Sequence, residues 1–248
     1  MPRIAILGGG LCGRLTALQL AEQGLSVALF DKGGRKGEHA AAYVAAAMLA
    51  PASEAVEATP EVIKLGRQSI PLWRNIKGRL KTPTMMQENG SLIVWHGQDK
   101  PLSNEFVRHL KRGGVADDEI VRWRADEIAE REPQLGGRFS DGLYLPTEGQ
   151  LDGRQMLSVL ADALDELNVP CHWEHECAPD DLHAQYDWLI DCRGYGAKTA
   201  WNQSPEHTST LRGIRGEVAR VYTPEITLNR PVRLLHPRYP LYIAPKEN

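Results

Sequence analysis

The sequence has 248 residues, of which 42 % are hydrophobic and 25 % charged, and its formal net charge is −3. These proportions are typical of a globular protein and exclude low-complexity disorder, because there is enough apolar surface to form a core. No stretch reaches the roughly 18 apolar residues that a membrane-spanning helix requires. The small negative charge gives no reason to expect nucleic acid as a partner. The length allows one large domain or two smaller ones.

An apolar strand, a glycine-rich turn, a helix and a second apolar strand follow one another at the start of the chain. The strands are expected at 4–7 and 27–30, the turn at 8–13, and Asp31 directly follows the second strand. Strand, glycine turn, helix, strand and acid is the order that a dinucleotide-binding βαβ unit requires. We therefore expect this segment to bind a dinucleotide.

Each residue of the turn has a physical task in that interpretation. Gly8 permits a tight turn, Gly10 lets the backbone approach a pyrophosphate, and Gly13 lets the helix pack closely on the strand. The phosphates would lie at the helix N-terminus, beside Leu11 and Cys12. Asp31, followed by Lys32, would accept hydrogen bonds from a ribose, and its charge disfavours the 2′-phosphate of NADP. The turn alone does not distinguish NAD from FAD.

An alanine-rich stretch at 40–51 has two interpretations. Alanine favours helix, so the stretch could be a plain helix; small side chains could instead allow it to pass beneath a flat cofactor. It resembles the AAAGML(A)P segment of the D-amino-acid oxidase superfamily, nearest to the glycine oxidase branch used in thiamine biosynthesis. That resemblance implies that Ala46, Ala47 and Met48 contact the flavin. The sequence departs from the family at Ala47, where glycine is usual, and at 41–43, where serine or threonine is usual.

The pattern after residue 51 alternates between helical and extended segments. In chain order it predicts a helical region over 54–80 interrupted at Pro71, a strand at 91–95 after a turn, helices at 104–112 and 125–131, extended chain over 142–152, and a helix at 155–167 capped by Asp152. The segments at 89–95 and 132–152 also resemble the part of the family that enters the substrate domain.

A second glycine-bearing strand end lies at 186–197. It resembles the D-W-(V/L)-(V/I)-D-(C/A)-(R/T/S)-G strand of flavoproteins, whose turn lies against the nucleotide, so Cys192 and Gly194 are implied cofactor contacts. An ordinary strand–helix junction is the alternative. The segment 169–177 resembles the strand whose end touches adenine in relatives, which implies a contact from Cys177. Together with the first turn, these segments favour FAD over NAD.

Four scattered cysteines show no metal-ligand spacing. They lie at positions 12, 171, 177 and 192. No signal peptide is expected, because a short polar start leads directly into an apolar strand. Unpaired thiols fit a reducing cytoplasm. His172 lies near two of the cysteines, but on a continuous strand it would face away from residues 171, 175 and 177. We therefore expect structural cysteines, a cytoplasmic protein and no metal.

The C-terminal part resembles two further family segments. Residues 211–218 resemble the element that begins the second pass through the substrate sheet, and 233–246 resemble the (C/L)YIVPR strand. The resemblance implies that Tyr242 faces the substrate carboxylate, whereas a core role is the alternative. The family's G-(L/F)-R-P arginine and the strand after the tyrosine strand are not found. The cations available lack that context; they are Arg212, Arg215, Arg233 and Arg238.

The resemblance implies an α/β protein of two interleaved domains. A Rossmann-like FAD-binding domain with a parallel sheet would comprise 1–81 and 152–210, and an α+β substrate domain on an antiparallel sheet would comprise 82–151 and 211–248. The implied reaction is FAD-dependent oxidation of the C–N bond of a small amino acid or amine, in which the cofactor performs the difficult step. Because family segments are missing, the alternative is a nucleotide-binding module that is inactive without a partner chain or homo-oligomer. An NAD-dependent dehydrogenase remains if both flavin-like segments are coincidental.

Overall fold

The computed structural model describes residues 1–207 and 210–247. The chain forms two compact units, each built from segments that are far apart in the sequence. Unit 1 comprises Met1–Ala45, Leu80–Thr82 and Gly153–Ala219, and unit 2 comprises Ala46–Arg79, Pro83–Asp152 and Arg220–Asn248. This division differs from the expected domain bounds mainly over 46–79, which belong to unit 2 because their strand pairs there.

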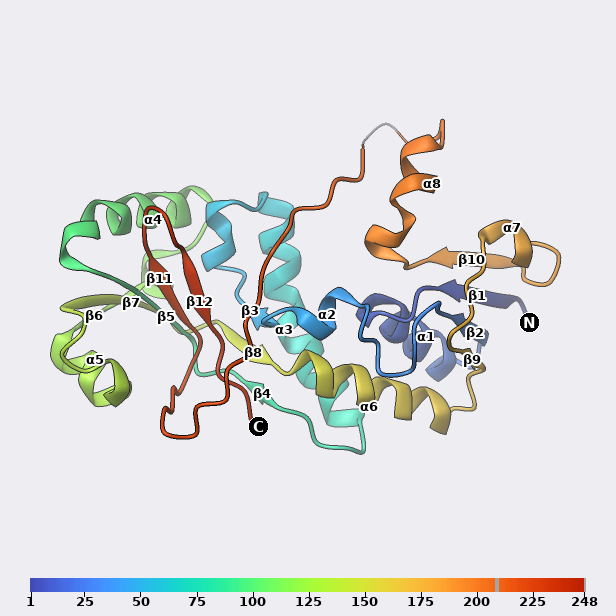
Figure 1. Ribbon diagram of the computed structural model, residues 1–248, viewed down its shortest axis with the longest axis horizontal. Helices are drawn as coiled ribbons and strands as arrows, with labels where there is room; N and C mark the ends of the chain where they lie inside the picture. Colours follow the sequence, from blue (N-terminus) through green and yellow to red (C-terminus); the bar gives the residue numbers. More distant parts are fainter. Residues whose placement is uncertain (208–209, 248) are drawn as a thin grey trace. The chain divides into compact units, whose positions relative to one another are not determined.

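A four-stranded parallel sheet forms the centre of unit 1. Its order is β10-β1-β2-β9, with β1 at Arg3–Leu7, β2 at Ser26–Phe30, β9 at Cys171–His172 and β10 at Trp188–Asp191. Figure 1 shows the orange β10 running beside the dark-blue β1, although the two lie in distant parts of the sequence. Both faces of β1 and β2 are covered, as their continuous apolar sequences predict.

Helices pack against this sheet and against one another. Helix α1 (Leu11–Glu22) packs on β1, β2 and α6 (Gly153–Glu166), while the short helix α7 (Pro179–Leu182) buries Leu182 against Phe30 and its neighbours. Helix α2 spans only Ala41–Val44, and α8 spans Lys198–Gln203 after a 3-10 turn at Gly194–Ala197. The plain-helix interpretation of 40–51 is therefore wrong, because the chain becomes extended after Val44.

Unit 2 contains a five-stranded sheet and a three-stranded sheet. The larger has the order β12-β11-β5-β7-β6 and the smaller β3-β8-β4. All pairings are antiparallel except β11 with β5, so the larger sheet is mixed rather than purely antiparallel. The strands are β3 (Met48–Leu49), β4 (Met86–Gln87), β5 (Ser91–Trp95), β6 (Val121–Arg124), β7 (Asp141–Leu145), β8 (Gly149–Leu151), β11 (Val232–Leu235) and β12 (Leu241–Ile243).

Three α-helices and several 3-10 turns complete unit 2. The helices are α3 (Pro60–Arg79), α4 (Lys100–Arg112) and α5 (Ala125–Arg131), and the turns span Ser53–Val56, Gly97–Asp99, Asp117–Glu119 and Pro133–Leu135. Apolar residues from the larger sheet, α4 and the first 3-10 turn form the main core. It contains Ala52, Ala55, Ile63, Ile93, Trp95, Phe106, Leu110, Val115, Leu143, Leu145 and Leu235.

Three sequence predictions need correction here. Helix α3 continues through Pro71, because buried residues on both sides of the proline hold the two halves of the helix in place. Helix α4 begins at Lys100, four residues earlier than expected, with Pro101 in its first turn. Residues 211–218 form no strand and are largely exposed, since no neighbouring strand offers them hydrogen bonds.

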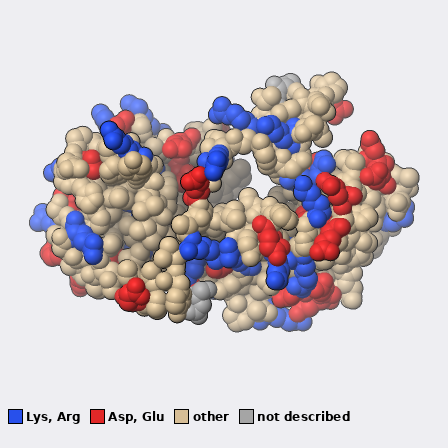
Figure 2. All heavy atoms as spheres, in the orientation of Figure 1, with Lys and Arg blue, Asp and Glu red and all other residues tan. Residues whose placement is uncertain are grey.

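The surface carries charges of both signs. On the face shown in Figure 2, Lys and Arg side chains are interspersed with Asp and Glu. Within the described ranges, no helix combines the length and the apolar character needed to cross a membrane.

Candidate functional site

The glycine turn of unit 1 is closed by the end of β10. Gly8 has a φ of +102°, and a Cβ placed on it would lie 2.6 Å from the carbonyl carbon and oxygen of Cys192. A Cβ on Gly13 would lie 1.8 Å from the carbonyl oxygen of Gly8. The backbone N–H of Cys192 also donates to Leu7, at 2.7 Å. The structure thus brings the two glycine-bearing segments into direct contact, and we call residues 8–13 with 191–194 the cradle.

The N-terminus of α1 is open to an anion. Gly10 is the N-cap residue, no side chain caps the helix, and its first turn contains no acidic residue. A Cβ on Gly10 would meet only Ala40 Cβ, at the ordinary contact distance of 3.7 Å. Free helix N–H groups and the helix dipole favour a bound phosphate. The turn therefore fits the pyrophosphate of a dinucleotide, with Leu11 and Cys12 in the first helical turn.

Asp31 orders the loop that faces the cradle. Its carboxylate accepts hydrogen bonds from the backbone N–H of Gly9 and, at 2.6 Å, from that of Gly33. Each carboxylate oxygen has a second lone pair, so the side chain keeps the capacity to accept a ribose hydroxyl. The ribose contact stays a prediction. Lys32 lies 4.0 Å from Glu176, and both side chains are mostly exposed.

Arg14 is fully buried behind the turn, which the sequence analysis missed. Its guanidinium donates to the carbonyl oxygens of Gly9 at 2.6 Å, Leu157 at 2.5 Å and Arg35 at 2.8 Å. Burial lowers the pKa of Arg14 to about 10, although Asp31 opposes this effect. The side chain therefore remains protonated at neutral pH and ties the glycine turn to α6 and to the loop after β2.

The second turn of the cradle has its own ion pair. Arg193 contacts the carboxylate of Asp191 at 2.6 Å, and Gly194 has a φ of +55°. Burial alone would raise the pKa of Asp191, but hydrogen bonds from Arg193 lower it below its usual value. This pair holds the backbone at Cys192 and Gly194 in the conformation that closes on Gly8.

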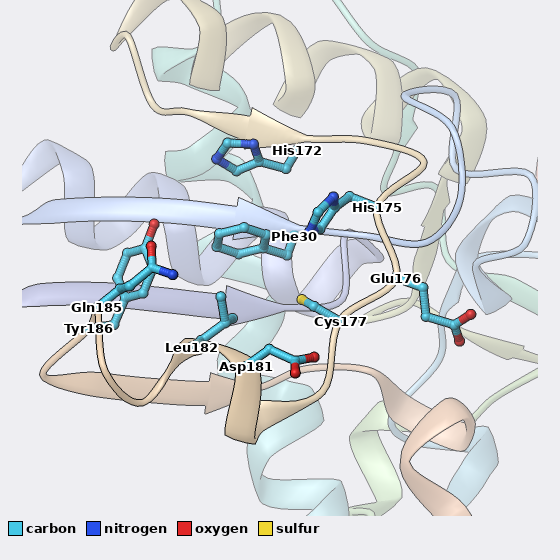
Figure 3. A pocket seen from close by; sticks show the side chains of 9 residues that line it. All are labelled: Phe30, His172, His175, Glu176, Cys177, Asp181, Leu182, Gln185 and Tyr186. Atoms are coloured by element: carbon cyan, nitrogen blue, oxygen red, sulfur yellow. The ribbon is translucent and has the colours of Figure 1, made fainter.

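A separate cavity of about 410 Å³ lies beside Phe30, and Figure 3 shows its lining. Cys177 lines this cavity, and so do His172 and His175. The expectation that His172 faces away from the other two is wrong, because β9 ends at His172 and Glu174 adopts a φ of +54° that turns the chain. Within the described part of the chain, no group of three or more His, Cys, Asp or Glu residues could hold a metal.

The predicted flavin-facing residues Ala46, Ala47 and Met48 belong to unit 2. Ala47 has a φ of +54°, the left-handed region that glycine adopts most easily. Its carbonyl oxygen accepts a hydrogen bond from the backbone N–H of Leu151 at 3.0 Å, and Met48 begins β3. The conformation explains why glycine is the usual residue of the family at this position. The contacts of the three residues with a flavin stay a prediction.

Tyr242 lies directly opposite Arg233 on strands β12 and β11. The Arg233 guanidinium lies 4.7 Å from the centre of the Tyr242 ring and donates to the carbonyl oxygen of Ser53 at 3.2 Å. Arg233 is buried, and its Nε has no hydrogen-bond partner within the described residues. Burial raises the pKa of Tyr242, although Arg233 opposes this effect. Arg233 was expected only as an available cation, and its place beside Tyr242 follows from the pairing of β11 with β12.

Two further polar residues of unit 2, the buried Glu148 and the partly buried Lys246, were not singled out from the sequence. Glu148 accepts hydrogen bonds from the backbone N–H of Ser53 at 2.6 Å and from the hydroxyls of Ser53 and Ser91. Burial raises the pKa of Glu148 despite these bonds. Lys246 donates to Gln150 at 2.8 Å, and burial lowers its pKa to about 8. Both residues lie outside the strands, Glu148 between β7 and β8 and Lys246 after β12, so no local pattern marks them.

The fold and the cradle together define a class of protein. A parallel sheet with a glycine turn that fits a dinucleotide, accompanied by a second unit built on a mixed sheet, is an α/β arrangement found in FAD-containing oxidoreductases. The chain belongs to the DAO family of FAD-dependent oxidoreductases, whose pattern matches residues 3–248. The predictions of fold class, of family and of FAD as the cofactor are thereby confirmed.

Two curated sequences illustrate the relationship. The chain is 34 % identical over 245 residues to a Rhizobium etli protein named "Putative thiamine biosynthesis oxidoreductase ThiO", and the match covers 99 % of this chain and 68 % of that protein. It is 29 % identical over 167 residues to a glycine oxidase of Geobacillus kaustophilus, covering 64 % of this chain and 42 % of that protein. The chain therefore matches only part of the length of each relative.

Solved structures show the same fold. The crystal structure of glycine oxidase from Geobacillus kaustophilus matches with a TM-score of 0.61 and 25 % identity, covering 71 % of this chain and 48 % of that one. An L-α-glycerophosphate oxidase from Mycoplasma pneumoniae with FAD bound matches with a TM-score of 0.64 and 16 % identity, covering 94 % and 65 %. At that identity the second likeness speaks for the fold alone.

Proposed function

We propose that the protein oxidises the C–N bond of a small amino acid or amine with FAD. The observation that carries the proposal is the cradle, in which Cys192 closes on Gly8 and leaves Gly10 and the α1 N-terminus open. The name of one relative, the glycine oxidase of Geobacillus kaustophilus, supports the substrate class.

Bound FAD would supply the chemistry by accepting a hydride from the α-carbon of the substrate. The chain itself would bind the cofactor and orient the substrate. The N–H groups of Leu11 to Gly13 would hold the pyrophosphate, and Asp31 would accept a ribose hydroxyl. The small side chains of Ala46 and Ala47 would leave room for a flat ring. Arg14, which binds the carbonyl of Gly9, keeps the turn in place before the cofactor arrives.

Arg233 and Tyr242 are the residues we assign to the substrate carboxylate. A guanidinium is the side chain best suited to a carboxylate, because it donates two parallel hydrogen bonds. Arg233 has an Nε without a hydrogen-bond partner in the described residues and lies against the Tyr242 ring. Tyr242 can donate its hydroxyl to the same ligand. The substrate amine would be unprotonated when the hydride leaves, because its free lone pair stabilises the positive charge that develops on the α-carbon.

The test is anaerobic reduction of the flavin. The purified protein, saturated with FAD, is mixed with glycine, sarcosine and D-alanine, and we expect bleaching of the visible flavin band by at least one of them. Arg233→Lys should raise the substrate concentration needed for half-maximal reduction of the flavin by about tenfold, because one hydrogen bond to a charged group is lost. Arg238→Lys, at an exposed position before β12, is the matched control and should not change it.

The possible results separate the functional alternatives. Flavin binding without reduction by any amine would favour the nucleotide-binding module that needs a partner chain. Failure to bind FAD would overturn the proposal. Equal effects of the Arg233 and Arg238 substitutions would overturn the assignment of Arg233 while leaving the oxidation itself in place.

A further inference from the structure

Two of the four cysteines meet inside the cradle. Cys12 lies in the first turn of α1, and Cys192 directly follows β10. The thiol of Cys192 lies near enough to the thiol of Cys12 and the hydroxyl of Thr16 for both groups to influence its pKa. Thr16 in turn donates to the carbonyl oxygen of Cys12 at 2.8 Å. The three side chains thus form one small cluster.

The backbone independently places these cysteines together. A Cβ on Gly13, the residue after Cys12, would lie 3.4 Å from Cys192 Cβ. The register of β1 with β10 fixes Cys192 at this level, because its N–H donates to Leu7 at 2.7 Å. The backbone of Cys192 is therefore held beside the first turn of α1 by the pairing of β10 with β1.

The two thiols differ in access. Cys12 is exposed, whereas Cys192 is half-buried, and burial raises the pKa of Cys192 to about 11. A dissolved oxidant would thus reach Cys12 first, and Cys192 would stand next to the product. An exposed thiol with a second thiol beside it is the arrangement found at reversible thiol-oxidation sites. The other two cysteines lie elsewhere, Cys171 in β9 and Cys177 at the cavity of Figure 3.

We propose that Cys12 and Cys192 form a reversible disulfide that weakens the binding of FAD. The oxidant is a hydroperoxide. The Cys12 thiolate attacks the O–O bond of hydrogen peroxide and becomes a sulfenic acid, and one water leaves. The Cys192 sulfur then attacks the Cys12 sulfur, and a second water leaves. In total, two thiols lose two electrons and two protons, and one peroxide becomes two waters.

The disulfide would disturb the groups that hold the cofactor. Joining the two sulfurs requires them to approach to the length of a covalent S–S bond. The Cys192 backbone cannot move toward the turn, because it already touches Gly8 so closely that no Cβ fits between them. The first turn of α1 must therefore shift, and its N–H groups are those that face the pyrophosphate. If the proposed function holds and oxygen is the electron acceptor, the peroxide would be the protein's own product; that link alone depends on the proposed function.

The experiment uses the full chain and added hydrogen peroxide, without any amine substrate. After treatment, free thiols are alkylated and the digested protein is analysed by mass spectrometry. We expect a cross-linked peptide pair containing Cys12 and Cys192. In parallel, titration with FAD should show about tenfold weaker binding, which is the cost of one lost hydrogen bond to a charged group. Dithiothreitol should reverse both changes.

Single variants make the test specific. Cys171→Ser should still form the cross-link, whereas Cys12→Ser and Cys192→Ser should not, and peroxide should leave the FAD affinity of the latter two unchanged relative to their own untreated samples. Oxidation of Cys12 to sulfonic acid without a cross-link would overturn the proposal. A cross-link with unchanged FAD affinity would also overturn it. The cross-link forms with added peroxide and is detected by mass spectrometry. This test therefore does not depend on whether the protein oxidises an amine.

Discussion

Gly8 and Gly10 lie two positions apart in the same turn but face different neighbours. A Cβ on Gly8 would press on the backbone of Cys192, whereas a Cβ on Gly10 would point toward open space and meet only Ala40. We therefore expect Gly8→Ala to destabilise the fold by about 2–4 kcal/mol through strain at positive φ and overpacking. Gly10→Ala should keep the wild-type stability and bind FAD at least about tenfold more weakly, because the added methyl occupies the ligand's side.

Thermal unfolding and FAD titration of the two variants check this expectation side by side. Each variant serves as the control for the other, since both add one methyl group to the same turn. Wild-type FAD affinity in Gly10→Ala would show that the pyrophosphate does not approach this residue. Wild-type stability in Gly8→Ala would show that the β10 end can retreat from the turn.

Glu148 predicts a particular dependence of stability on pH. Its pKa is raised by burial, so the folded protein holds this proton more tightly than the unfolded chain does. The contribution of Glu148 to stability is therefore fully present below its unfolded pKa and is lost as pH rises through the raised folded value. Glu148→Gln removes this titration. Urea unfolding across a pH series should show the variant gaining stability relative to the wild type as pH rises.

A control at a partly exposed carboxyl, Glu127→Gln, should change little over the same pH range, since Glu127 lies outside the buried cluster around Glu148 and bonds the N-cap of α5. If the free energy difference between Glu148→Gln and the wild type stayed constant with pH, the raised pKa would be wrong.

Buried charged side chains are the residues that are hardest to predict from the sequence. Arg14 lies just after the glycine turn, at a position where a charged residue in a helix is normally expected to face solvent. One of its hydrogen-bond acceptors is nevertheless the carbonyl oxygen of Leu157, 143 residues later. The glycines could be assigned in advance because their role is local: a tight turn and a close approach need no distant partner to be recognised. Arg14, Glu148 and Arg233 become significant only when remote segments surround them.

At the scale of elements, helix α3 offers the clearest test. Pro71 lies inside the helix and is exposed, while Ile70 and Trp73 beside it are buried. An interior proline removes a helical hydrogen bond. Pro71→Ala should therefore raise the free energy of unfolding by about 1–3 kcal/mol without altering the buried face.

Thermal and urea unfolding measure that gain, and Gln68→Ala is the control for a general increase in helix propensity one turn earlier, at another exposed position. Unchanged or lower stability in Pro71→Ala would show that the proline fits the geometry of α3 and is needed there.

Elements with strong local patterns were predicted closely, and those that depend on a partner were not. The strands β1, β2 and β5 and the helix α5 lie within a residue of their expected bounds. By contrast, 169–177 contains a strand of only two residues, and 211–218 contains none. A strand exists only where another offers hydrogen bonds, and no periodicity reveals that. Ala47 shows the same limit, because its positive φ is set by the pairing of β3 with β8.

At the scale of the whole molecule, the resemblance to a family contributed more than the residue patterns did. Periodicity could suggest a parallel sheet near the N-terminus, but it could not show that a segment near residue 190 completes that sheet. The family segments at 186–197 indicated it, and the pairing of β1 with β10 is present in the structure. The substrate side was predicted less well, because the expected arginine context was absent and the cation beside Tyr242 could be recognised only from the folded sheet.

The closing of the glycine turn by β10 also sets an order of events during synthesis. Arg3 and its partner Asp187, at the start of β10, are separated by 184 residues. At about 5–20 residues per second, a ribosome needs roughly 10–40 s to make the second strand after the first. For that interval the nascent turn has no neighbour to press against, and contacts so distant along the chain form slowly. A flavin that binds the finished cradle thus meets the chain only after the residues that follow β10 have been made.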